Sequence, residues 1–172
     1  LFDADGDGDL DAYLVQAGGV DAPREERPGN ALFLNRGDGH FEPAPAGHGA
    51  DDRGYGMGVA TGDYDGDGDV DLYVSNLTRN ALLRNDGTGR FEDVTEAANA
   101  DVPAWSASAA FLDADGDGDL DLFVTNYIEW STDGEKVCLS PQKTRTYCSP
   151  KSYDRPARDT LLLNRGDGTF ED

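Results

Sequence analysis

Three short stretches of this 172-residue chain each carry five aspartates within nine residues. The stretches are 3–11, 63–71 and 113–121, and each has the pattern Asp-x-Asp-Gly-Asp-Gly-Asp-x-Asp. Carboxylates placed this closely repel one another, and a compact chain tolerates them when a cation lies among them. All side-chain donors are hard oxygens, without His or Cys, which disfavours zinc and copper and suits calcium, magnesium or manganese.

Calcium fits these loops better than magnesium does. Calcium accepts about six to eight oxygen ligands in a flexible geometry, whereas magnesium demands a strict octahedron and keeps several waters. The glycines at the fourth and sixth loop positions allow the backbone to turn tightly around an ion. We therefore predict about three bound Ca²⁺ ions, one in each loop. The competing interpretation is an acidic turn that holds no ion.

The position of each aspartate in its loop predicts its role. Positions 1, 3, 5 and 9 are expected to offer side chains, and position 7 its backbone carbonyl, with its own side chain facing solvent. An EF-hand shares this opening but needs a Glu at position 12, where this chain has Leu14, Val74 and Val124. The strand formers after each loop predict a strand there instead of a helix. The predicted metal residues are Asp3, Asp5, Asp7, Asp9, Asp11, Asp63, Asp65, Asp67, Asp69, Asp71, Asp113, Asp115, Asp117, Asp119 and Asp121.

A second motif recurs in register with the loops. Residues 30–42, 80–92 and 159–171 each contain an apolar run, an Asn/Gly/Asp turn and a Phe, a pattern typical of a β-hairpin. The spacing from Asn30 to Asp63 equals that from Asn80 to Asp113, 33 residues in both cases. The spacing from the end of each loop to its hairpin instead varies, from 9 to 19 to 38 residues. Insertions therefore enter at one point of the repeat, which predicts a variable loop on one face.

Small residues alternate just before the second and third loops, as in Gly56, Gly58 and Ala60. They predict an inner strand crowded by neighbouring backbone. One repeat then holds four strands, in the second copy at about 55–62, 72–76, 81–84 and 90–94. Tandem four-stranded units of about 50 residues are characteristic of β-propellers.

The predicted fold class is therefore all-β, with about three four-stranded antiparallel blades that form part of a propeller. The expected blades are 1–50, truncated at its N-terminus, 51–100, and 101–172, the last with an insert at 127–158. Because a closed ring usually needs about four to eight blades, we expect a piece of a larger propeller or a chain that joins copies of itself.

These residues resemble the FG-GAP/VCBS repeats of integrin-α-like β-propellers. Within that group they are most similar to the CRTAC/ASPIC-UnbV type, and the insert sequence Tyr147-Cys148-Ser149-Pro150 also resembles that of this type. The resemblance implies that the loop between the first and second strands of each blade binds calcium. It covers nearly the whole chain, but no C-terminal ASPIC-like segment is present in it.

The chain is strongly acidic, with 35 Asp and Glu against 14 Lys and Arg and a formal net charge of −21. Such a charge disfavours nucleic acid and anionic membranes as partners. No apolar run approaches the roughly 20 residues that span a bilayer. We expect no nucleic-acid partner and no membrane span, and instead protein or glycan partners or copies of the chain itself.

The only cysteines, Cys138 and Cys148, both lie in the insert. A disulfide between them would stabilise that loop by up to roughly 3 kcal/mol; the alternative is two free thiols in a cytosolic protein. A disulfide and weak calcium loops both favour an extracellular or periplasmic location. Asn76-Leu77-Thr78 matches the N-glycosylation sequon, which makes Asn76 a candidate for modification.

No catalytic residues are predicted. The two histidines have no Ser or Cys at motif spacing, and aspartates that bind calcium are not free for proton transfer. We expect Trp105, Trp130 and the tyrosines to serve core or inter-blade packing.

The first hypothesis is a non-catalytic, calcium-binding extracellular segment that serves adhesion, interaction with proteins or glycans, or assembly. One alternative is a self-assembling filament subunit. The other is a domain of a glycan-active lyase or hydrolase that uses Glu129, Asp133 or Glu135 on the insertion-bearing face.

Overall fold

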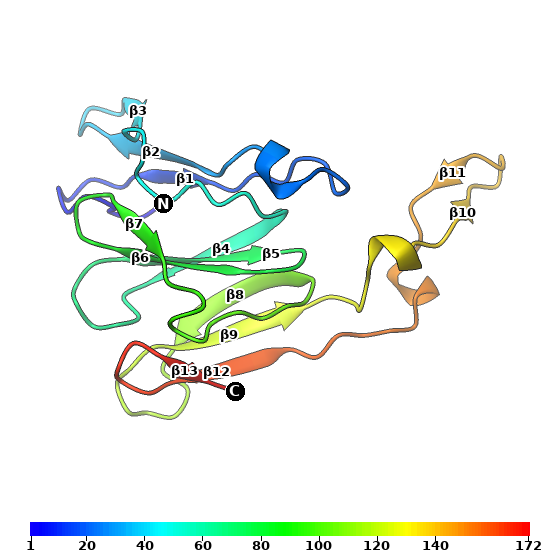
Figure 1. Cartoon of the computed structure of the whole chain (residues 1–172). Coiled ribbons are helices and arrows are strands. Elements are labelled where there is room, and N and C mark those ends of the chain that lie inside the picture. The colour runs from blue at the N-terminus through cyan, green and yellow to red at the C-terminus, as the bar shows by residue number, and fades with distance from the viewer.

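Each repeat forms its own antiparallel sheet, and the three sheets lie side by side in chain order (Figure 1). A computed structural model describes residues 1–172. The first sheet contains β1 (Ala12–Leu14), β2 (Ala31–Asn35) and β3 (Phe41–Pro43). The second contains β4 (Gly56–Gly62), β5 (Asp71–Asn76), β6 (Ala81–Asn85) and β7 (Phe91–Asp93). The third contains β8 (Ser106–Leu112), β9 (Asp121–Asn126), β12 (Thr160–Asn164) and β13 (Phe170–Glu171).

The expected all-β fold class is confirmed, and two of the sheets have the predicted four strands. In the second sheet each strand begins and ends within one residue of its predicted bounds. The first sheet has three strands, and an isolated bridge between Phe2 and Asp11 lies where the other sheets have their first strand. The strands follow one another as a meander, so sequential strands pair, as they do in a propeller blade.

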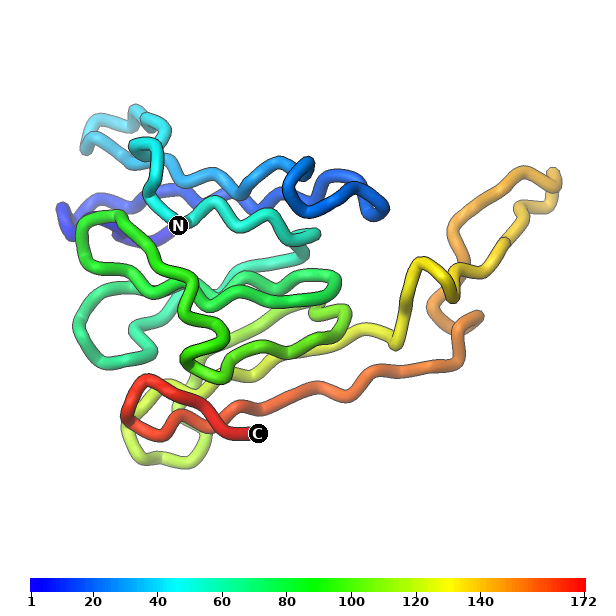
Figure 2. Tube along the Cα trace, in the orientation of Figure 1, coloured from blue at the N-terminus to red at the C-terminus, as the bar shows by residue number.

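The two ends of the sheets carry different loops. The aspartate loops and the tight hairpin turns lie together at one end, and the loops of variable length lie at the other (Figure 1). The longest variable loop, between β9 and β12, extends away from the sheets (Figure 2). Insertions thus enter on a single face, as the repeat spacing predicts.

Two apolar cores fill the spaces between neighbouring sheets. Because side chains alternate along a strand, β5 contributes to both cores: Leu72 and Val74 pack with the first repeat, and Tyr73 packs with the third. The Tyr73 hydroxyl also donates to the carbonyl oxygen of Ala100 at 3.0 Å. Its equivalent Tyr13 donates to that of Ala50 at 2.8 Å. Each of these tyrosines therefore joins its own sheet to the segment that leads into the next one.

The inner strand of the second sheet lies directly against the first repeat. The Gly56 N–H donates to the carbonyl oxygen of Gln16 at 3.0 Å. A Cβ on Gly56 would lie 2.2 Å from Cγ1 of Val15 and 2.7 Å from that carbonyl oxygen. On the same strand, a Cβ on Gly58 would lie 3.4 Å from the carbonyl oxygen of Ala107 and 3.9 Å from Cα of Ser108, both of which are ordinary contacts. The crowding predicted from the small residues is therefore strongest at Gly56.

The insert is an extended excursion closed by a disulfide. Cys138 and Cys148 are bonded, which confirms the expected pairing. Cys138 is the first residue of β10 (Cys138–Leu139), and Cys148 lies two residues after β11 (Arg145–Thr146), so the disulfide closes this short hairpin. The short 3₁₀ turns of the chain are η1 (Arg24–Glu26), η2 (Thr132–Gly134) and η3 (Pro150–Ser152), the last two within the insert. None of the helical turns has the length and apolar content needed to cross a membrane.

We predict that Gly56→Ala destabilises the chain by about 1–3 kcal/mol, because the added methyl overpacks the contact between sheets. The matched variant Gly58→Ala should change the free energy of unfolding much less, since its methyl meets ordinary van der Waals contact. Urea denaturation followed by circular dichroism measures both values. Equal stability of the two variants would contradict this account of the inner strand.

Candidate metal centre

Each aspartate loop gathers three carboxylates at one point. In every group the residues offer one oxygen each, and these oxygens lie within 4.8 Å of one another. The members occupy loop positions 1, 3 and 9, so the structure brings together three of the five predicted residues in each loop. The groups are Asp3, Asp5 and Asp11; Asp63, Asp65 and Asp71; and Asp113, Asp115 and Asp121.

The aspartate at position 9 connects its loop to the third strand of the sheet. Asp71 is fully buried, and its two oxygens accept the backbone N–H groups of Tyr64, at 3.1 Å, and Asn85, at 2.8 Å. Asp11 and Asp121 are buried and bonded in the same way. Burial raises the pKa of Asp71 to about 7, although both backbone donors act to lower it. The sequence pattern alone does not reveal this second, structural role.

The aspartate at position 1 folds the loop back on itself. The two oxygens of Asp3 accept the N–H groups of Gly6 and Gly8, both at 2.9 Å. Both glycines have positive φ, at 73° and 91°, a region that other L-residues rarely adopt. These bonds point the loop backbone inward and leave the carboxylate beside those at positions 3 and 9.

The aspartate at position 3 carries an oxygen with no partner. Oδ1 of Asp5 and Oδ1 of Asp65 are both buried and accept no hydrogen bond. Burial, and then the neighbouring carboxylates, raise the pKa of both residues. A buried oxygen without a donor is costly, and a hard cation supplies the missing partner. The donor set and these two atoms therefore fit a calcium ion.

The remaining two positions lie outside the groups. The carboxylates at position 5 are exposed and accept the backbone N–H of position 7, at 2.9 Å in each loop. We expected the carboxylates at position 7 to face solvent, but they are only partly exposed, because the tight turn of the same sheet lies against them. A Cβ on the turn glycines would lie within 2.7 Å of those carboxylates, as found for Gly37 with Asp9, Gly87 with Asp69 and Gly166 with Asp119.

Each of the first two loops is also held by the following repeat. Nδ2 of Asn85 donates to the carbonyl oxygen of Ala4 at 2.9 Å, and Nδ2 of Asn164 donates to that of Tyr64 at 2.7 Å. The equivalent oxygen of Ala114, in the third loop, receives no such bond. In agreement, Asp113 and Asp115 are exposed, whereas the matching residues of the other loops are partly buried. In the sequence, the Asn that recurs before each tight turn is the feature from which this contact could have been predicted.

The structure argues against glycosylation of Asn76. Its side chain is fully buried. Its Nδ2 donates to Oδ2 of Asp52 and to the carbonyl oxygen of Arg79, both at 3.0 Å. A glycan on this nitrogen would displace both bonds and have no path to solvent. Asn76 is therefore not a candidate attachment site in the folded chain.

A meander of four antiparallel strands with an acidic loop between its first two strands defines the repeat of this protein as a β-propeller blade. Residues 3–74 and 63–124 each match the FG-GAP-like repeat, so that one match covers the first two loops and the other the last two. The chain therefore belongs to the FG-GAP-like repeat family. No curated protein matches it in a sequence comparison. The narrower resemblance to the CRTAC/ASPIC-UnbV type stays a prediction.

We predict that Asp71→Ala destabilises the chain even in the presence of a chelator. The substitution leaves the N–H groups of Tyr64 and Asn85 buried without an acceptor, at about 1–3 kcal/mol each, so we expect a loss of about 2–6 kcal/mol. The control Asp67→Ala removes an exposed carboxylate of the same loop and should stay within about 0.5 kcal/mol of the parent chain. Urea unfolding in EDTA measures both. Similar losses for the two variants would show that Asp71 has no structural role apart from binding a cation.

Proposed function

We propose that this chain is a calcium-stabilised, non-catalytic propeller segment that acts outside the cytoplasm, in adhesion or in binding of protein or glycan partners. The observation that carries the calcium assignment is the convergence of three carboxylates in each loop, with a buried oxygen of Asp5 and of Asp65 left without a donor. Carboxylate oxygens are the ligands that Ca²⁺ prefers in proteins.

The ion's role in this proposal is structural. The carboxylates at loop positions 1, 3 and 9 would hold Ca²⁺, and the position 5 side chain and the position 7 carbonyl would complete the set. Three divalent ions would offset six of the formal charges that give the chain its value of −21. Because the same loops contact the third strand and the next repeat, ion binding is coupled to folding and to the packing of sheets.

Three observations support a non-catalytic, extracellular role. FG-GAP repeat domains are generally non-catalytic. Among the alternative acidic residues, Glu135 accepts bonds from Trp130 Nε1 at 2.5 Å and from the Tyr153 hydroxyl at 2.9 Å, which occupy its Oε2. The disulfide of the insert is compatible with an oxidising compartment.

We predict that Ca²⁺ binds the chain and raises its melting temperature. A ligand at about a hundredfold excess over its Kd raises the free energy of unfolding by about 2.7 kcal/mol per site. For a chain of this size, this corresponds to a rise in melting temperature of roughly 5–10 °C per site. Isothermal titration calorimetry gives the number of sites, and differential scanning fluorimetry with and without EGTA gives the shift.

Two substitutions make this test specific to the loops. Asp65→Asn removes a charge from the second group and should lower the stoichiometry by one ion. Asp101→Asn removes an exposed charge outside the loops and should leave the stoichiometry unchanged. A titration without heat, together with a melting temperature that the chelator does not alter, would rule out the calcium assignment.

A further inference from the structure

A cavity of about 530 Å³ lies at the end of the sheets opposite the aspartate loops, between the insert and the variable loops. Its size is within the range of sites for small organic ligands. Only Tyr13, Tyr64 and Tyr73 of the tryptophans and tyrosines are buried in the cores. The other six, which we expected to serve packing, all line this cavity: Tyr55, Trp105, Tyr127, Trp130, Tyr147 and Tyr153.

The rings are arranged as walls instead of a filled core. Trp105 meets Tyr127 edge to face, with centroids 5.3 Å apart and planes at 72°. It meets Trp130 in the same manner, at 5.5 Å and 67°. Tyr147 is 99% exposed, so its ring is free to contact a bound molecule. Aromatic faces at these angles offer apolar surfaces in more than one direction, together with N–H and O–H groups at their edges.

One of those polar edges lacks a partner. Nε1 of Trp105 is buried and donates no hydrogen bond, whereas Nε1 of Trp130 donates to Glu135. Trp105 therefore offers the cavity the faces of its ring. Because the lining rings present apolar faces and polar edges, a ligand that fits this cavity combines apolar C–H groups with hydrogen-bonding groups.

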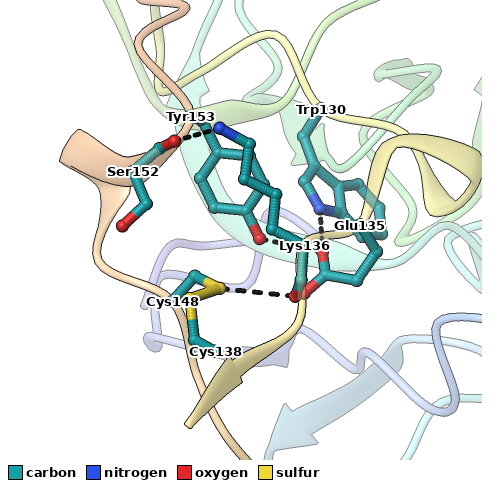
Figure 3. The surroundings of a disulfide bond; sticks show 7 residues. All are labelled: Trp130, Glu135, Lys136, Cys138, Cys148, Ser152 and Tyr153. Atoms are coloured by element: carbon teal, nitrogen blue, oxygen red, sulfur yellow. Dashed lines mark hydrogen bonds between the residues drawn. A yellow bond between two sulfur atoms is a disulfide. The ribbon is translucent and has the colours of Figure 1, made fainter.

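The charges around the cavity favour a neutral ligand. Figure 3 shows Glu135 between Trp130 and Tyr153, which both donate to it. Nζ of Lys136 lies 5.5 Å from the centroid of the Tyr153 ring, so the chain's own lysine already occupies the position over this ring that a cationic ligand would take. Three charged residues line the cavity, Asp21, Glu135 and Arg145, so it has no excess of positive charge, and the strongly acidic chain also disfavours an anion.

We propose that this cavity binds a neutral sugar residue of a glycan. A sugar ring presents C–H groups to aromatic faces, and its hydroxyl groups can hydrogen-bond to exposed polar groups of the lining, such as the Tyr147 hydroxyl and the Arg145 guanidinium. The proposal rests on the interaction role proposed above and names its ligand class, but it does not depend on the calcium loops, which lie at the other end of the sheets.

The test uses the full chain on an array of immobilised neutral glycans built from glucose, galactose, mannose, fucose and N-acetylglucosamine, with sialylated and sulfated glycans beside them. The neutral glycan that gives the strongest signal is then titrated in solution and followed by tryptophan fluorescence. We expect saturable binding to a neutral glycan in preference to the charged ones. Binding to none of the neutral glycans, or to charged glycans only, overturns the proposal, as does capture of peptides from a random library without any glycan binding.

Variants connect the binding to the cavity. Trp105→Ala and Trp130→Ala each remove one aromatic ring from the lining of the cavity, and each should raise the Kd for the glycan at least tenfold. Phe41→Ala, which removes a partly exposed ring from β3, should leave the Kd unchanged. An unchanged Kd in both tryptophan variants overturns the proposal.

The same samples are titrated with Ca²⁺, so that the two proposals fail separately. A variant that keeps the calcium-dependent shift in melting temperature is folded, and its loss of glycan binding then supports the cavity. If Ca²⁺ binds and no glycan does, the assignment of calcium to the loops is retained and only the proposed sugar site is rejected.

Discussion

The structure depends on one interaction that recurs three times, the buried aspartate at the end of each acidic loop. Asp71 accepts one N–H from its own loop and one from the end of β6, so a single carboxylate fixes the loop relative to two strands. Burial of this charge beside other carboxylates is unfavourable without compensation. The backbone donors supply one part of the compensation, and the calcium ion of our proposal supplies the other. The same residue thereby fixes the local backbone and contributes to the proposed ion site.

The contacts between repeats extend this coupling from one sheet to the next. Asn85 reaches from the second hairpin to the backbone of the first loop, and Asn164 reaches from the third hairpin to the second loop. Tyr13 and Tyr73 connect the repeats at a second level through carbonyl oxygens of the linking segments. Because each loop is bounded by two repeats, an ion in it would stabilise the contact between sheets as well as the sheet that provides the ligands.

Features that depend on short stretches could be predicted from the sequence. The strand bounds of the second repeat, the acidic loops and the common position of the insertions follow from patterns within about 50 residues, and the Cys138–Cys148 pair lies within a single loop. Features that depend on packing between distant segments could not. Asn76 is buried where its side chain donates to Asp52 of the preceding linker. The position 7 carboxylates lie against the hairpin turns, and the aromatic cavity forms because the insert lies beside Trp105. None of these contacts leaves a local pattern.

The separation of the two ends of the sheets has a consequence for how this repeat can change. The aspartate loops lie at one end, whereas the segments that vary between 9, 19 and 38 residues lie at the other (Figure 1). Surface loops tolerate insertions better than the elements they connect. New surfaces can therefore arise at the variable end while the carboxylates keep their positions. The same scaffold can thus acquire different partners during evolution without any change in how it is stabilised.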